Sequence, residues 1–579
     1  MKFKSLGIML AVFVATAAFA QEWPQWALNA QHNTQSSILG QALNRNIVNI
    51  VYDPLVPAEQ AAALQVYGSA DLLVHYQAPL VDGNDTYMMF KSGPYSFTDN
   101  STQTWGETKF SWVNGTLAQQ WQFTSDWKAA GSQNDFWEPV FHPALANGSL
   151  YVPGFGGTIW RVNKLTGTSV RINPFSGPLD GSKYEAGSLT VDAQGRVLYN
   201  VIQLKNGTKD FYADDIIDSF LIRVSPDNSI EKVSYSTLTV GAPGGKDQCS
   251  NAFSTSQLPW PPSPTAVAPT VICGTQRPGM NSSLTVAPDG TIYTATRAHL
   301  ISREAFIVAI NSDLTQKWIS TLRDRMNDGC GVPVSQGGSL PPNGAPGGCR
   351  AGANLGVDPA TNRPGGGRIF DDQSSTVVVA PDGSLWYGAF TRYNYDQGHI
   401  MKFSSSGAFL GSYRFGWDDT PGIYVHGATY SVVTKDNQYG GIGSYCNDDT
   451  LCPPDRDSVS PDYPEAYYIT QLNKNLNVEW RFQSTNTLSC SRDANGNVTC
   501  VSDHPKGFEW CVNAFVVDSA GYVYANSEDG NLYKIAQGAL SATHIFQQLA
   551  VGAAYTPTSI GSDGKIYSQN AGHLFVAGN

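Results

Sequence analysis

Carboxylates, amides, aromatic rings and one imidazole recur in this sequence just before short apolar runs, and these groups could do chemistry. Oxygen and nitrogen atoms of these types could hold a cation, a sugar or a carbonyl compound if the fold brings them together. The candidate binding residues are Trp137, Glu138, Tyr184, Glu185, Asn281, Asp372, Gln373, His426, Glu509 and Asn513. Glu138, Glu185 and Asp372 are the candidate metal ligands among them. The alternative is that such residues only cap strands and bind water.

His426 is the sharpest single candidate for catalysis, because it interrupts the otherwise apolar and small run "YVHGATY". Paired with a carboxylate, an imidazole could act as a general base in a hydrolase or a lyase. The alternative is a histidine held by structural hydrogen bonds, since no H-x-H or H-E-x-x-H spacing accompanies it.

Other motifs restrict the possible functions. The sequence has no G-x-S-x-G nucleophile elbow, no P-loop and no C-x-x-C-H haem attachment site. The acid pairs Asp371-Asp372 and Asp448-Asp449 lack the spaced oxygens of a dedicated calcium loop. A net charge of −12 without a basic stripe argues against nucleic acid or an anionic membrane as partner.

A repeated unit decides how these residues are positioned. "SLTVAPDGTIYTAT" (283–296) returns as "TVVVAPDGSLWYGA" (376–389) and "AFVVDSAGYVYANS" (514–527), each being two apolar runs around a turn. Two further apolar runs follow most copies, which gives the four antiparallel strands of a propeller blade. The spacing predicts an all-β propeller of about eight blades, with seven as the alternative because the first is irregular.

The two ends of the chain are expected to close the ring. The last copy supplies only three strands, and the early run "NIVNIVYDP" (46–54) has no partner of its own. We expect this run to complete the last blade and leave no free edge. The best helix candidate is "PAEQAAAL" (57–64), which begins with Pro57.

Long segments fall on one side of the predicted ring. The turns inside the repeated unit are short, whereas four insertions at 239–279, 326–371, 444–465 and 487–509 separate its copies. In a four-stranded blade these insertions all emerge on the same face. We call it the loop-rich face, and we expect binding or catalysis there because functional residues gather on loops held by a rigid scaffold.

Eight of the nine cysteines lie in neighbouring pairs inside these insertions. We expect disulfides, and the pairs are Cys249 with Cys273, Cys330 with Cys349, Cys446 with Cys452, and Cys490 with Cys500. Cys511 is left over, and its apolar surroundings favour a buried, inert thiol over a reactive one.

The N-terminus indicates export. Residues 1–20 combine two lysines, an apolar stretch and the A-x-A site Ala18-Phe19-Ala20, as in a cleaved signal peptide. We expect a secreted or periplasmic protein with a mature chain from about Gln21, and a single propeller domain over 21–579. No later segment is apolar for long enough to span a membrane, and we expect a monomer.

The opening "EWPQWALNAQHNTQSS" (22–37), followed by units such as "DGTIYTAT", resembles the pyrroloquinoline-quinone-like (PQQ-like) β-propeller superfamily. That superfamily contains quinone-dependent dehydrogenases and outer-membrane assembly scaffolds. In the dehydrogenases, adjacent cysteines contact the quinone, and Glu, Asn and Asp hold Ca²⁺ beside it. The resemblance implies that Glu138 or Glu185, Asn281 and Asp372 could supply such ligands, but no adjacent cysteine pair occurs here.

Three functional hypotheses follow. The leading one is an exported propeller that binds a small molecule, a sugar or a protein on its loop-rich face without redox chemistry. The second is a dehydrogenase of alcohols or sugars that uses PQQ with Ca²⁺. The third is a propeller hydrolase or lyase that uses His426 with a carboxylate.

Overall fold

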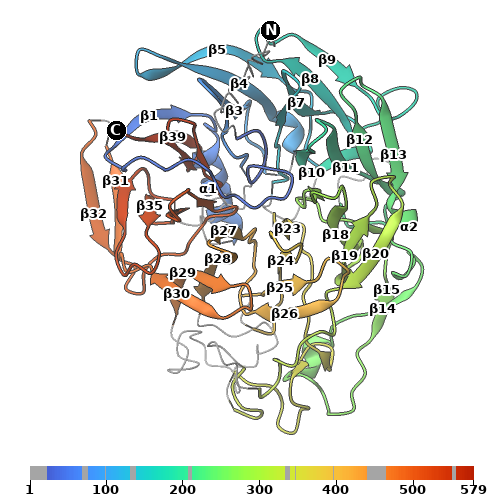
Figure 1. Cartoon of the computed structure of the whole chain (residues 1–579). Coiled ribbons are helices and arrows are strands. Elements are labelled where there is room, and N and C mark those ends of the chain that lie inside the picture. Colours follow the sequence, from blue (N-terminus) through green and yellow to red (C-terminus); the bar gives the residue numbers. More distant parts are fainter. Residues whose placement is uncertain are drawn as a thin grey trace, which may run out of the picture.

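Four-stranded antiparallel sheets follow one another around a ring in the computed structural model of this chain (Figure 1). The structure describes residues 23–67, 76–97, 99–130, 138–205, 211–332, 340–345, 347–394, 397–439, 465–493, 495–550 and 556–579. These residues form eight blades. The predicted all-β propeller is therefore confirmed, and eight blades rather than seven is the right number.

The first half of the ring contains blades 1 to 4, whose strands follow one another from the inside outward. Blade 1 is β2 (Leu80–Asp82), β3 (Asp85–Ser92), β4 (Thr104–Val113) and β5 (Thr116–Thr124). Blade 2 is β6 (Ala144–Ala146), β7 (Ser149–Gly154), β8 (Thr158–Asn163) and β9 (Ser169–Ile172). Blade 3 is β10 (Lys183–Val191), β11 (Val197–Gln203), β12 (Asp218–Val224) and β13 (Ile230–Ser234). Blade 4 has its inner strand in two pieces, β16 (Gln276–Pro278) and β17 (Thr285–Val286), followed by β18 (Ile292–Ala298), β19 (Ile301–Ile310) and β20 (Gln316–Thr321).

The second half contains blades 5 to 8. Blade 5 is β23 (Val378–Val379), β24 (Leu385–Ala389), β25 (His399–Phe403) and β26 (Phe409–Tyr413). Blade 6 is β27 (Gly422–His426), β28 (Thr429–Gln438), β29 (Ala466–Asn473) and β30 (Val478–Gln483). Blade 7 is β33 (Val516–Val517), β34 (Val523–Asn526), β35 (Asn531–Ile535) and β36 (Thr543–Phe546). Blade 8 is β37 (Ser559–Ile560), β38 (Ile566–Asn570), β39 (His573–Gly578) and the N-terminal β1 (Arg45–Val51).

The ring closes where the two ends of the chain meet. β1 pairs antiparallel with β39, with Arg45 opposite Gly578 and Val51 opposite His573. The first strand of the chain is thus the outer strand of the last blade, as the unpaired run at 46–54 predicted. This pairing joins the two ends of the sequence by main-chain hydrogen bonds and leaves the C-terminal strand without a free edge.

Asp-Gly turns set the phase of the blades. In blade 4, Asp289 Oδ1 accepts a hydrogen bond from the Thr291 amide at 2.9 Å, and Gly290 takes a φ of +83°. Glycine suits this left-handed position because it carries no Cβ, and aspartate stabilises the turn through its side chain. The turn joins the inner strand to the second strand, so each copy of the motif marks the same face of the ring.

Hydroxyl groups on the inner strands tie neighbouring blades together. Thr190 Oγ1 donates to the Leu284 carbonyl at 2.7 Å, and Thr285 Oγ1 donates to the Val377 carbonyl at 2.6 Å. Ser559 does the same across the closure of the ring, donating to the Pro79 carbonyl at 2.7 Å. These bonds satisfy buried polar groups where the blades meet, and apolar side chains fill the rest of each interface.

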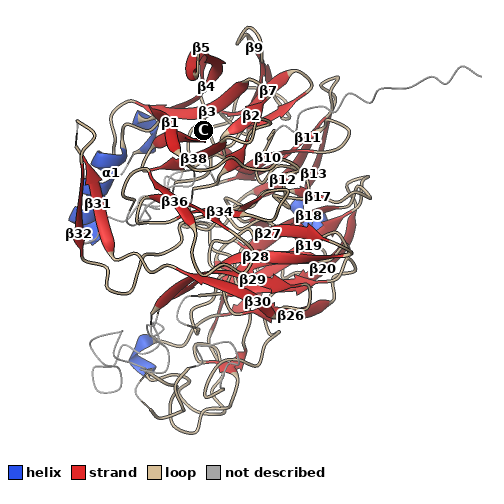
Figure 2. Cartoon of the chain, turned by 60° about the vertical axis from the view of Figure 1, so that its left-hand side comes forward, coloured by secondary structure: helices blue, strands red, loops and turns tan. Residues whose placement is uncertain are grey.

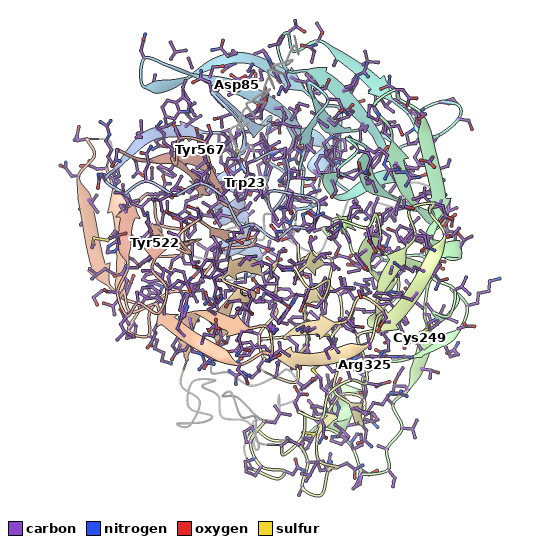
Figure 3. The ribbon with its side chains drawn as sticks, in the orientation of Figure 1. Trp23, Asp85, Cys249, Arg325, Tyr522 and Tyr567 are labelled. Atoms are coloured by element: carbon purple, nitrogen blue, oxygen red, sulfur yellow. A yellow bond between two sulfur atoms is a disulfide. The ribbon has the colours of Figure 1, made fainter. Side chains whose placement is uncertain are left out.

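An N-terminal segment, residues 23–41, runs once around the centre of the ring, where it is dark blue in Figure 1. It hydrogen-bonds to the inner part of every blade in turn, and its partners from blade 1 to blade 8 are Val81, Leu145, Val191, Val286, Val379, Ile423, Val517 and Gly564. Figure 3 shows Trp23 near the centre of the ring. These partners lie at the ends of the inner strands, so the segment covers the face opposite the insertions.

Two of the insertions, 239–279 and 326–371, fold together into a lobe that extends from the ring (Figure 2). Its strands are the pairs β14 (Gln248–Ser250) with β15 (Thr270–Ile272) and β21 (Val357–Asp358) with β22 (Arg363–Pro364). A core that includes Phe253, Trp260 and Leu340 fills it. Cys249, on β14, lies where the lobe joins the rim of blade 4, as Figure 3 shows.

Three of the predicted disulfides are confirmed. Cys249 bonds to Cys273, Cys330 to Cys349 and Cys490 to Cys500. Cys446 and Cys452 lie outside the described residues, as does most of their insertion at 444–465. Cys511 is a buried free thiol, as expected, and burial followed by the charges of Glu528 and Glu509 raises its pKa well above the usual value.

Helices are few. α1 (Val56–Tyr67) confirms the helix expected at 57–64 and follows the closing strand directly. Elsewhere in the described part of the chain are α2 (Tyr235–Leu238) and the 3-10 turns η1 (Asn100–Thr102) and η2 (Thr255–Gln257). Among the described residues, no helix has the length and apolarity that crossing a membrane requires. The expected signal peptide lies outside the described residues.

Candidate functional site

The eight inner strands begin on the loop-rich face and end at the N-terminal segment. We call the beginnings of these strands, with the residues just before them, the mouth of the ring. Most of the predicted site residues lie at this mouth, where they belong to separate buried polar clusters. Trp137 falls outside the described residues.

Glu138 belongs to a cluster at the junction of blades 8 and 1. Its Oε2 lies 2.7 Å from Lys91 Nζ, and its Oε1 accepts a hydrogen bond from the Trp105 indole at 2.9 Å. The same ammonium lies 2.6 Å from Glu59 of helix α1 and 3.2 Å from Asp53. Burial alone would lower the pKa of Lys91, but the carboxylates of Asp53, Glu138 and Glu59 raise it well above the usual value. Glu138 therefore serves an internal ion pair.

The pKa of Glu59 is also perturbed in this cluster. Burial raises its pKa to about 8, and the neighbouring carboxylates of Asp53 and Glu138 add to the shift that Lys91 opposes. Three carboxylates surround one ammonium here, so one of them is held more stably as the neutral acid. Its Oε2 is buried and accepts no hydrogen bond from the described residues.

Glu185 is buried at the start of blade 3. Neither of its carboxylate oxygens accepts a hydrogen bond of ordinary geometry from the described residues. Burial raises its pKa well above the usual value, and the nearby Trp127 indole opposes that shift only in part. Tyr184, its neighbour, packs against an apolar cluster that includes Ala186 and Met280.

Asp371 is the centre of a second cluster, between blades 4 and 5. It forms a bidentate pair with Arg277 at 2.7 and 2.6 Å, and Arg297 Nη1 lies 3.0 Å from its Oδ2. Tyr212 also donates to Oδ2, at 2.6 Å. Burial alone would raise the pKa of Asp371, but the guanidinium groups of Arg277 and Arg297 lower it far below its usual range. The arrangement fastens the end of the lobe to blade 4.

Asn281 joins three parts of the mouth. Its Oδ1 accepts a hydrogen bond from the Val140 amide at 2.9 Å, and its Nδ2 donates to the Asp371 carbonyl at 3.0 Å. Asp372 is only half-buried. Burial lowers the pKa of Arg297, and the charges of Asp371 and, less strongly, Asp372 oppose that shift. The structure thus brings Asn281 close to the predicted Asp372, but the hydrogen bond goes to the main-chain carbonyl of Asp371, the residue before it.

A third cluster, at the mouth of blades 5 to 7, joins Asn513 through Asp418 to Ser374, the residue that follows Gln373. Asn513 Nδ2 donates to Ser374 Oγ at 2.6 Å and to Asp418 Oδ1 at 3.2 Å. Gln373 Nε2 donates to the Tyr387 hydroxyl at 2.9 Å, while its buried Oε1 accepts no hydrogen bond from the described residues. We call this group the blade 5–7 cluster.

Asp419 belongs to the same cluster and was missed in the sequence. Its amide donates to Ser375 Oγ at 3.0 Å, and its Oδ2 accepts from Thr434 Oγ1 at 2.5 Å. Burial raises its pKa to about 7, with Lys435 and Thr434 opposing the shift. Its Oδ1 is buried without a donor among the described residues. An adjacent acid pair at the start of an inner strand, in "WDDTPG", was the available signal.

Glu509 lies before the inner strand of blade 7, close to the free thiol. Its carbonyl accepts hydrogen bonds from the Ser527 hydroxyl and the Glu528 amide, both at 3.1 Å. Cys511 Sγ lies 3.3 Å from Glu528 Oε1. The raised pKa of Cys511 disfavours the thiolate, so this thiol is a poor nucleophile.

His426 lies on the other face of the ring. It is the last residue of β27 and pairs with Thr429 across the tight turn to β28. Its Nε2 lies 2.8 Å from Ser431 Oγ, and its ring stacks on Tyr424 at 4.9 Å. The expectation that it opens an inner strand at the mouth is corrected, because the turn at Gly427 lacks the Asp-Gly motif and the blade begins one strand earlier. No described carboxylate hydrogen-bonds to it.

The predicted calcium ligands do not fit a quinone–calcium site. Glu138 is held by Lys91 and Trp105, and the Asn281 oxygen already accepts the Val140 amide. No group of three or more His, Cys, Asp or Glu residues in the described part of the chain could hold a metal ion. Among the predicted metal ligands, Glu185 presents both carboxylate oxygens without a hydrogen-bond donor of ordinary geometry from the described residues, and one ligand is not a calcium site.

Comparison with solved structures finds distant likenesses that extend over most of the chain. Similar structures include a europium-containing methanol dehydrogenase (10% identity, covering 95% of this chain and 89% of that chain, TM-score 0.48). Others are a quinohemoprotein alcohol dehydrogenase from Comamonas testosteroni (11%, 97% and 81%, TM-score 0.46) and BamB from Moraxella catarrhalis (10%, 92% and 99%, TM-score 0.38).

With identities of 10–11% and TM-scores below 0.5, these likenesses carry no statement about what this chain does. The eight four-stranded blades are the architecture that the count of repeated units predicted. No family model and no curated protein matches the sequence.

Proposed function

We propose that this chain is an exported propeller that binds a hydroxyl-rich ligand, such as a saccharide, at the mouth of the ring without redox chemistry. The observation that carries the proposal is the pair of buried acceptors in the blade 5–7 cluster, Gln373 Oε1 and Asp419 Oδ1, for which the described residues supply no donor. Leaving such a group unsatisfied costs about 1–3 kcal/mol. Sugar hydroxyls are donors that could recover this free energy once the surrounding side chains move to admit them, because Gln373 and Asp419 are both fully buried without a ligand.

The arrangement of the chain around the ring also favours ligand binding on the loop-rich face, where the mouth lies. The N-terminal segment covers one end of the ring, and the disulfide-bonded insertions at 239–279 and 326–371 join the blades at the other end. Disulfides of this kind persist in secreted and periplasmic proteins. A ligand at the mouth would meet carboxylates and amides, which are the side chains that discriminate between hydroxyl groups.

Binding to an array of mono- and oligosaccharides, followed by calorimetry with the best hit, tests the proposal. Asp419→Asn keeps the size of the side chain but replaces one acceptor with a donor, and we expect binding to weaken at least about tenfold. His426→Ala is the matched control, because His426 lies on the opposite face, and its affinity should equal that of the wild type. An array without hits, or equal affinities for wild type and Asp419→Asn, would contradict the proposal.

A further inference from the structure

A groove of about 550 Å³ lies at the outer edge of the ring, away from the mouth. One wall is the disulfide hairpin of β31 (Leu488–Arg492) and β32 (Val498–Ser502), and the other is formed by the outer strands of blades 6 and 7. Figure 1 shows this hairpin at the margin of the ring, beside blade 7. We call it the rim groove, and its lining includes Phe482, Leu488, Val498, Tyr533, His544 and Phe546.

Apolar side chains stay exposed along the rim groove. Leu540, Val498 and Leu488 are exposed to 93%, 44% and 40%. The Cys490–Cys500 bond, which also lines the groove, holds the two strands of the hairpin together. A preformed groove with apolar and aromatic walls and a volume of this size is typical of sites for small molecules, and covering the exposed carbon atoms would stabilise the complex.

One guanidinium, that of Arg492, lies beside the rim groove, although the chain as a whole carries a net charge of −12. The Arg492 guanidinium lies 5.3 Å from the centre of the Phe546 ring. His544 leans against Tyr533, with ring centres 5.3 Å apart. The neighbouring acid Asp529 is already held by Asn486 at 2.8 Å and by the Tyr533 hydroxyl at 2.5 Å.

We propose that the rim groove binds a small aromatic anion, with its ring among the apolar side chains and its acidic group toward Arg492 and His544. Phe546 and Tyr533 offer ring faces and edges for aromatic contact. The guanidinium supplies charge next to an aromatic surface, where it interacts with both parts of such a ligand. This site uses none of the mouth residues and stands independently of the proposed function.

The probe is 8-anilinonaphthalene-1-sulfonate, an aromatic sulfonate whose fluorescence rises on binding, compared with N-phenyl-1-naphthylamine, which lacks the sulfonate. Val498→Asp places a carboxylate in the lining, and Val501→Asp is its matched control. Val501 is exposed to 62% and lies three residues further along the same strand, on the opposite side of the hairpin. Leu540→Asp serves as a second lining variant, because so exposed a side chain contributes little to folding.

We expect the sulfonate dye to saturate at one molecule per chain, with an affinity at least about tenfold lower in Val498→Asp and in Leu540→Asp. Val501→Asp should bind as the wild type does. Arg492→Gln should weaken the sulfonate dye about threefold and leave the neutral dye unchanged. Equal affinities in Val498→Asp and Val501→Asp, an unchanged Leu540→Asp, or equal effects of Arg492→Gln on both dyes would overturn the proposal.

Discussion

Replacing Glu59 by glutamine should change how stability depends on pH. In the folded protein burial raises the pKa of Glu59 to about 8, whereas an exposed glutamate in the unfolded chain titrates near its ordinary value. Between these two values the folded state binds one more proton than the unfolded state. Wild-type stability must therefore fall as the pH rises through this window. Glutamine stays neutral, so this contribution disappears in Glu59→Gln.

The structure sets the size of the effect. Glu59 Oε1 lies 2.6 Å from Lys91 Nζ, and the Oε1 atom of glutamine could accept the same hydrogen bond. At pH 5 the protonated glutamate and glutamine are therefore nearly equivalent. For each pH unit above pH 5, the free energy of unfolding of the wild type falls by about 1.4 kcal/mol relative to that of the variant. The difference amounts to at most about 4 kcal/mol at pH 8.

Urea unfolding of both proteins, followed by tryptophan fluorescence at half-unit steps from pH 5 to pH 8.5, measures this difference. Glu231→Gln is the control, since Glu231 is half-exposed in a surface pair with Arg223 and should show the pH profile of the wild type. A difference between Glu59→Gln and wild type that stays constant over this range would refute the reasoning.

Three further changes test the framework around the mouth. Asp371→Asn leaves the buried guanidinium groups of Arg277 and Arg297 without their carboxylate, and it should lower the free energy of unfolding in urea by about 3–5 kcal/mol. Asp289→Asn, in an exposed turn, should change that free energy little. His32→Ala removes a buried ring that lies 2.8 Å from an inner-strand carbonyl of blade 4 and should cost about 3 kcal/mol in the same assay. Serine at both Cys249 and Cys273 should destabilise the lobe by about 3 kcal/mol, seen as faster amide exchange in 248–272 with the blades unchanged.

The architecture was predictable because local turn chemistry repeats. Asp289 and Gly290 adopt the geometry that their residue types favour, and equivalent turns fix the order of strands in most blades. The unpaired run at 46–54 could then be assigned to the missing outer strand of the last blade, where it pairs with β39. Blade 6 departs from the pattern, because its turn at Gly427 has no aspartate, and His426 was consequently placed on the wrong face.

The contacts of the site residues were less predictable, because their partners come from distant parts of the chain. Gln373 and Asn513 were expected at the mouth, but Asp418 was not. Asp418 accepts hydrogen bonds from Ser374 and Asn513, which lie 44 and 95 residues away from it in the sequence. Glu138 was predicted to be a metal ligand. Its ion-pair partner Lys91 lies 47 residues away in the sequence, and no local pattern indicates that the two residues meet. The N-terminal segment has no strand periodicity, so its path around all eight blades was not visible.

The central claim, that the mouth binds a ligand without redox chemistry, is tested most directly by titrating the purified chain with PQQ in the presence of Ca²⁺. Quenching of tryptophan fluorescence reports binding, and reduction of an artificial dye on addition of alcohols or sugars reports turnover. We predict no saturable quenching and no dye reduction. Stoichiometric binding of PQQ, with Ca²⁺-dependent dye reduction that Glu185→Gln abolishes, would contradict the claim.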